Sequence, residues 1–145
     1  MQDTEFIEAR LRDTSTLPEM LAAGFDAFEV IRRAARGYVD TVPGLFAAFM
    51  TTAREAVEGR EALTVAPSLP PGPAAIPASL PTADVSADEV MSALASLAAL
   101  VAGCLSRAAS TASLDADRVA CGEAAAAAQR IRRLMARDDD ATGLR

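Results

Sequence analysis

Residues 90–106 read VMSALASLAALVAGCLS, seventeen consecutive residues without a charged side chain. In this run the larger apolar residues recur at alternating steps of four and three, which places them along one side of an α-helix. A helix that is apolar on nearly every side has to be covered by other protein or by lipid. We therefore expect the apolar helix of residues 86–109 to be a packing or association surface, along the positions Val90, Leu94, Leu97, Val101, Cys104 and Ala108.

A second row of residues on the same helix is small rather than large. These residues are spaced four apart, and small side chains let two helices approach closely. Two interpretations of the helix stay open: packing inside its own chain, and association with another chain. A membrane span is less favoured, because the acidic residues before the helix give no positive-inside signal. The candidate interface comprises Val90, Leu94, Leu97, Val101, Ala95, Ala99 and Gly103.

Helix signals recur along the rest of the chain. The pairs Ser86/Glu89 and Thr16/Glu19 have the spacing of a capping box, which marks a helix N-terminus. Further helices are predicted over residues 4–12, from Thr16 to about Gly37, from Pro43 to Gly59 or Leu63, and after Ser113. In the first of these, Phe6, Ile7 and Leu11 share one side. Thr41 and Ser113 are the expected N-caps of the last two.

A segment rich in proline divides these helices into two groups. Residues 64–82 hold six of the eight prolines and no charge, so they favour extended polyproline II over helix or central strand. The sequence predicts an all-α bundle of four main helices, two hairpins joined by this crossover, with a short extra N-terminal helix. Residues 1–63 and 83–137 are expected to pack as one domain, and residues 138–145 to form a disordered acidic tail.

The composition excludes several classes of chemistry. There is no His, which removes Ser-His-Asp and Cys-His catalysis and the commonest metal ligand. All 14 basic residues are Arg, so neither a Schiff-base lysine nor a P-loop is present. We expect a protein that is not an enzyme and that holds no metal or cofactor. The net charge of −6 repels phosphate backbones, which argues against a nucleic-acid partner.

The cellular compartment is inferred from two features of the sequence. The first residues are acidic and polar, unlike the basic and apolar regions of a signal peptide. The chain has only two cysteines, which suits a reducing compartment. We therefore expect a cytoplasmic protein.

Two smaller groups of residues have alternative interpretations. Cys104 and Cys121 lie equally far from the turn between the last two helices, so they are either inert core thiols or a redox-sensitive pair. Arg130, Arg133 and Arg137 share one helix face, which is either a solvated helix end or a contact for an anion.

The function that the sequence favours is that of a non-enzymatic helical interaction protein, a homo-oligomer or adaptor. The expected partner is a protein chain, with neither nucleic acid nor membrane involved. The alternative is a bundle that binds a small apolar ligand or lipid between its aromatic helices. The residues that would line such a pocket are Phe25, Phe28, Phe46, Phe49 and Met50.

Overall fold

The computed structural model describes residues 2–71 and 86–136. These residues form five α-helices and a short 3-10 turn, without a strand, which confirms the all-α prediction. The crossover from residue 72 onward, Arg137 and the tail 138–145 lie outside the described residues. The elements are α1 (Gln2–Asp13), α2 (Leu17–Tyr38), η1 (Pro43–Leu45), α3 (Phe46–Thr64), α4 (Ala87–Thr111) and α5 (Asp115–Met135).

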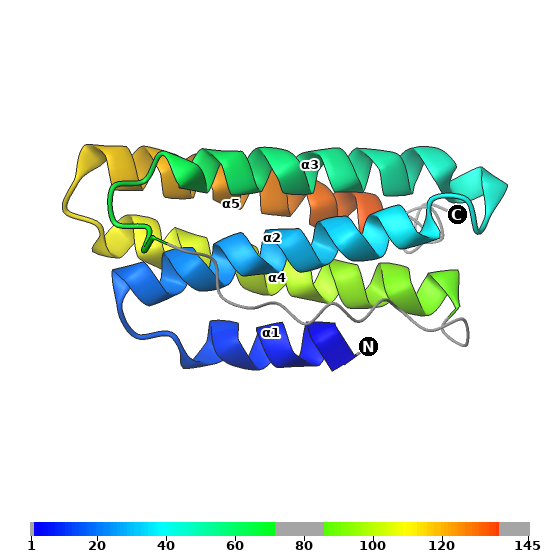
Figure 1. Ribbon diagram of the computed structural model, residues 1–145, viewed down its shortest axis with the longest axis horizontal. Helices are drawn as coiled ribbons and strands as arrows, with labels where there is room; N and C mark the ends of the chain where they lie inside the picture. The colour runs from blue at the N-terminus through cyan, green and yellow to red at the C-terminus, as the bar shows by residue number, and fades with distance from the viewer. Residues whose placement is uncertain (1, 72–85, 137–145) are drawn as a thin grey trace, which may run out of the picture.

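Four of the helices form an elongated antiparallel bundle (Figure 1). α2 packs on α3, α3 on α5, α5 on α4, and α4 on α2, so every neighbouring pair is antiparallel. α2–α3 and α4–α5 are the two hairpins that the sequence predicts. The short helix α1 lies outside this square and contacts both α2 and α4.

The core follows the apolar spacing of the helices. α4 contacts α5, α2 and α1, and its residues Val90, Leu94, Leu97 and Val101 are all 0% exposed. α1 helps to cover it with Ile7 and Leu11, each 1% exposed. The prediction that Phe6 joins them is wrong, because Phe6 is 55% exposed.

The helices α2 and α3 approach each other closely at one point. A Cβ atom added to Gly59 of α3 would lie 2.4 Å from Cζ of Phe28, so the absence of a side chain at Gly59 makes room for the ring. Phe28 itself is fully buried. Further along the same pair, the rings of Tyr38 and Phe49 pack with their centroids 6.1 Å apart.

Two helix starts follow the predicted capping pattern. At α2, the Glu19 N–H donates to Thr16 Oγ1 at 3.3 Å, and the Thr16 N–H donates to Glu19 Oε1 at 3.0 Å. Hydrogen bonds that Thr16 and Ser15 donate to the Glu19 carboxylate hold its pKa below the ordinary value, with the Thr16 hydroxyl as the largest cause. At α4, Ser86 Oγ accepts from the Glu89 N–H at 3.2 Å.

One predicted helix end lies within one residue of the observed end, and two predicted N-caps are wrong. α2 passes Gly37 and ends at Tyr38, which is buried in the core. The Thr41 N–H donates to the Tyr38 carbonyl, so Thr41 closes the end of α2, and Val42 is the N-cap of the turn that follows. α5 has Leu114 in place of Ser113 as its N-cap, without a side-chain cap, and the carboxylates of Asp115 and Asp117 lie in its first turn instead.

Candidate functional site

The helix α4 has two different faces. Its inner face carries the large residues Val90, Leu94, Leu97 and Val101, which lie in the core of their own chain. The structure therefore uses these four candidate interface residues for intramolecular packing. The three small candidates lie nearer the surface: Ala99 is exposed, and Ala95 and Gly103 are half-buried.

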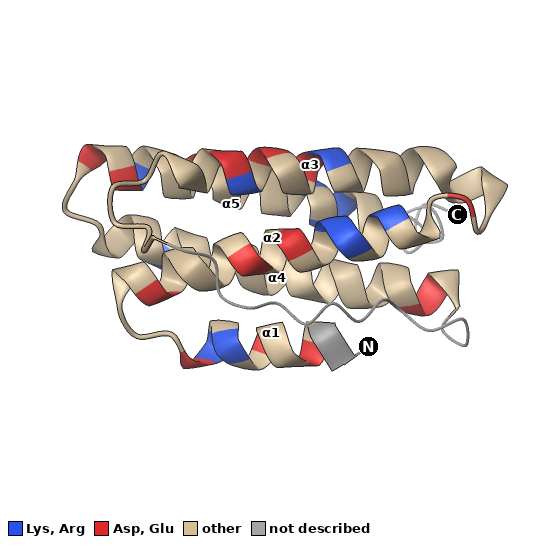
Figure 2. Ribbon diagram, viewed as in Figure 1, with Lys and Arg blue, Asp and Glu red and all other residues tan. Residues whose placement is uncertain are grey.

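The outer face of α4 also follows alternating steps of four and three. We use the name outer face for the residues that lie opposite the core and are exposed, apart from the half-buried Gly103. No charged residue occurs on α4 between Glu89 and Arg107, and the ribbon is uncoloured over this interval in Figure 2. The outer face consists of Ser92, Ser96, Ala99, Gly103 and Ser106.

The length and composition of α4 would also allow a membrane span. Among the described residues it is the one helix that passes this test. The core helix of a soluble protein passes the same test, and half of the most apolar 18-residue window of α4 is buried inside the chain. Length and composition therefore do not distinguish a span from a core helix with an uncovered side.

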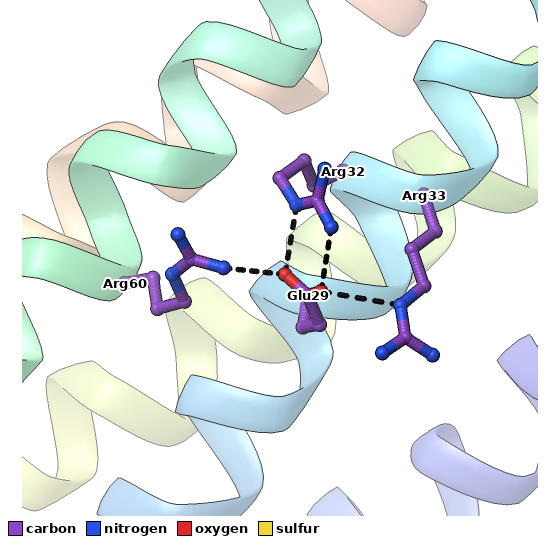
Figure 3. A network of polar contacts seen from close by, with 4 residues as sticks. All are labelled: Glu29, Arg32, Arg33 and Arg60. Carbon is purple, nitrogen blue, oxygen red and sulfur yellow. Dashed lines mark hydrogen bonds and ion pairs between the residues drawn. The ribbon is translucent and has the colours of Figure 1, made fainter. Parts of the chain in front are cut away.

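The surface of α2 and α3 differs from that of α4, because it is densely charged (Figure 2). At its centre, Glu29 is surrounded by three guanidinium groups, two from α2 and one from α3 (Figure 3). Arg32 Nη2 lies 2.7 Å from Glu29 Oε2, Arg33 Nε 3.1 Å from the same oxygen, and Arg60 Nη1 2.5 Å from Glu29 Oε1. The network ties α3 to α2 across the surface of the bundle.

This network changes the titration of Glu29. The hydrogen bond from Arg32 is the largest cause that lowers the pKa of Glu29, to about 2, and the charge of Arg60 adds to it. Glu29 in turn raises the pKa of Arg32. A carboxylate with such a low pKa stays ionised at neutral pH, and its ion pairs join α2 to α3.

One arginine near the end of α5, Arg130, forms ion pairs with α3. Arg130 Nε donates to Glu55 Oε1 at 2.9 Å, and Arg130 Nη2 lies 3.8 Å from Glu58 Oε2. Arg130 and Arg133 line one open hollow of about 380 Å3 together with Glu55. Because Glu55 already compensates the charge of Arg130, the hollow does not present two unpaired cations to an anion. Arg137, the third predicted member, lies outside the described residues.

Two buried carboxylates were not identified from the sequence. Asp26 of α2, 1% exposed, accepts a hydrogen bond from Arg10 Nη1 of α1 at 2.5 Å. Asp117 of α5, also 1% exposed, accepts from the N–H of Ser68 at 3.0 Å and from its hydroxyl at 2.6 Å. These contacts attach α1 and the start of the crossover to the bundle. Arg10 is 16 positions from Asp26 in the sequence, and Ser68 is 49 positions from Asp117, so no local sequence pattern predicts these contacts.

The two cysteines are free and fully buried. Burial is the main cause that raises the pKa of both thiols, and that of Cys121 reaches about 11, with Asp117 and the Cys104 thiol as further causes. Cys104 Sγ lies 3.8 Å from Thr14 Oγ1. Thiols that stay protonated at neutral pH are poor nucleophiles, which favours the interpretation of core residues over that of a redox pair.

The five residues predicted to line an apolar pocket differ in exposure, with Phe25 and Met50 half-buried. Phe28 and Phe49 are 0% exposed and fill the core, whereas Phe46 is 48% exposed at the end of the bundle. A second open hollow, of about 380 Å3, lies between α1, α2 and Pro70, with Arg10, Asp13 and Glu19 among the residues that line it. No group of three or more potential metal ligands occurs among residues 2–71 and 86–136.

Comparison with known proteins gives no relative for this chain: no protein-family model, no curated protein and no solved structure matches it.

Proposed function

We propose that this protein is a non-enzymatic helical interaction protein, which associates with another protein chain through the outer face of α4. The observation that carries the proposal is the absence of charge on α4 from Val90 to Ser106, although Ser92, Ser96, Ala99 and Ser106 are exposed. Solvent-facing positions of a surface helix ordinarily carry charged and polar groups. The outer face of α4 itself has only small side chains, and the charged group beside it is the Arg107 guanidinium, whose Nη1 lies 3.7 Å from the position of a Cβ atom at Gly103.

The exposed sides of the other helices are less suited to a protein contact than the outer face of α4, because they carry charged side chains. The exposed sides of α2 and α3 carry the Glu29 network, and α5 carries Arg118, Glu123 and Arg132 on its exposed side. Burying such charges against a partner costs free energy unless each is paired. The part of the outer face from Ser92 to Ala99 can be buried without this cost, since its serine hydroxyls can bond to their own helix backbone as Ser110 Oγ does to the Ser106 carbonyl at 3.2 Å.

Site-specific photo-crosslinking in the native cell tests the proposal. A photo-reactive amino acid at position 99 should produce crosslinks to a protein, whereas the same group at position 126, exposed on α5, should produce far fewer. The variant Ala99→Arg, combined with a photo-reactive group at position 96, should lose the crosslink while keeping its helical circular dichroism. Equal crosslinking at positions 99 and 126, or none at either, would overturn the proposal.

A further inference from the structure

We infer that the chain that covers the outer face of α4 is a second copy of this protein, with the two α4 helices antiparallel. This inference rests on the proposed function, and it adds the identity of the partner and the register of the contact. It depends on two independent observations. One is the spacing of the outer face, and the other is the distribution of charge at its two ends.

The spacing suits a close helix pair. Steps of four, three, four and three lead from Ser92 to Ser106 through the outer face. A line of side chains with this repeat stays in contact with a partner helix along its length. The side chains are Ser, Ala and Gly, so the two backbones can come closer than Leu or Ile would allow.

The charges at the two ends select the orientation. Glu89 lies seven residues before Ser96 and therefore extends the outer face at its N-terminal end, and Arg107 directly follows Ser106 at the other end. Both side chains belong to exposed residues. A parallel pair would place Glu89 against Glu89 of the other copy, which is repulsive. An antiparallel pair places Glu89 of one copy beside Arg107 of the other.

One register satisfies spacing and charge together. When Ser96 of one copy lies opposite Ala99 of the other, Ser92 lies opposite Gly103 and Glu89 opposite Ser106. The twofold axis then passes between Ser96 and Ala99, so each contact occurs twice, as in an isologous dimer. The outer face is thus complementary to itself in the spacing of its residues and in the charge at its two ends, which is the reason for assigning a second copy as its occupant.

The expected dimer is weak. The interval from Glu89 to Ser106 spans about 26 Å at 1.5 Å per residue. Small side chains over this length bury less area than a standard protein interface, so we expect a dissociation constant in roughly the micromolar range. Arg107 and Glu89 contribute mainly to orientation, and their effect should decrease as salt is added.

Disulfide crosslinking of the full-length chain tests the register. A mixture of Ser92→Cys and Gly103→Cys should form a disulfide-linked dimer under a mild oxidant, whereas Ser92→Cys alone should not. A Cβ atom at Gly103 meets only Arg107 Nη1, at 3.7 Å, so this variant should fold normally. The unmodified chain is the control for its buried native thiols. A dimer from Ser92→Cys alone would show a parallel pair and overturn the inference.

Charge reversal gives a second, independent test. Sedimentation equilibrium in low salt should show that Arg107→Glu weakens the dimer about tenfold, and that Glu89→Arg in the same chain restores it. A chain that stays monomeric at high concentration, but still crosslinks to another protein from position 99 in the cell, overturns the second copy and leaves the proposed function standing. A monomer without any such crosslink overturns both.

Discussion

The helices α3 and α4 distribute their residues in opposite ways. α3 buries mostly small side chains, such as Ala53, Ala56 and Gly59, and exposes Glu58 and Glu61. α4 buries large side chains, such as Leu94 and Leu97, and its exposed residues between the two ends are Ser and Ala. The two helices lie at opposite corners of the bundle and run in the same direction.

The difference shows two ways to hold a helix in one bundle. α3 lies close to its neighbours, as Gly59 does to Phe28, and ion pairs from Arg60 and Glu55 secure its outer side. α4 is held by the volume of its buried side chains, and no ion pair joins it to the other described residues. A helix of the first kind is complete within its chain, whereas one of the second kind keeps a surface that another chain can use.

The largest expected effect comes from breaking the buried side of α4. Leu97→Asp places a charge in a site that is 0% exposed, so it should lower the free energy of unfolding by more than about 4 kcal/mol or prevent folding. Leu97→Ala, at about 2–5 kcal/mol, provides a variant that can be measured in urea if the first does not fold. The matched control Ala99→Asp, on the outer face, should change the free energy by less than about 1 kcal/mol. Similar losses at positions 97 and 99 would contradict the two-faced description of α4.

Substitutions at two glycines test the close approach of α3 to α2. Gly59→Ala forces a Cβ atom against the Phe28 ring at 2.4 Å, so we expect a loss of about 1–3 kcal/mol from overpacking. Gly122→Ala, where a Cβ atom meets nothing within 4 Å, should instead stabilise the protein by about 0.5–1 kcal/mol through helix propensity. Thermal unfolding monitored by circular dichroism measures both. If both variants were stabilised alike, the contact between α2 and α3 would be looser than described.

The ion pairs on α2 and α3 predict a dependence on pH. Because the pKa of Glu29 is about 2 when folded and 4.5 ordinarily, its stabilisation is complete above pH 4.5 and disappears as the pH falls towards 2. Glu29→Gln should therefore cost about 1–2 kcal/mol at pH 7, a value reduced because Arg32 and Arg33 are about a third exposed. Urea unfolding of both proteins from pH 7 to pH 2.5 should show this difference shrinking. A difference that stays constant over this range would contradict the assigned pKa.

The sequence predicted the helices better than it predicted what covers them. The spacing of Val90, Leu94, Leu97 and Val101 leaves one possible inner face, and the structure confirms that these residues are buried. The sequence could not decide between the chain's own helices and another chain as the cover, because this depends on where α5, α2 and α1 pack. Ile7 and Leu11 of that short helix reach α4 only through a turn whose direction no spacing pattern specifies.

The polar contacts of the core were the least predictable part. Asp26 and Asp117 look like ordinary surface positions in their helices, and they are buried only because Arg10 and Ser68 arrive from distant parts of the chain. The ion pairs around Glu29 were not predicted from the sequence either, since Arg60 comes from another helix. Periodicity reports which side of a helix is apolar, but it contains no information on which side chain a buried charge will meet.

The smallest expected effect comes from a buried polar group, which α3 has and α4 lacks. The buried side of α4 is entirely apolar, whereas α3 places the hydroxyl of Thr52 in the core, where Oγ1 has no hydrogen-bond partner among the described residues. Thr52→Val replaces this hydroxyl by a methyl group of similar volume and removes its desolvation cost, so it should raise the free energy of unfolding by about 1 kcal/mol. Thr51→Val, at a half-exposed position, should change it by less than about 0.5 kcal/mol. Urea titrations of the two variants measure this difference, and a loss of stability in Thr52→Val would mean that the hydroxyl does have a partner. The gain in stability is expected because α3, unlike α4, contributes a hydroxyl group to the core.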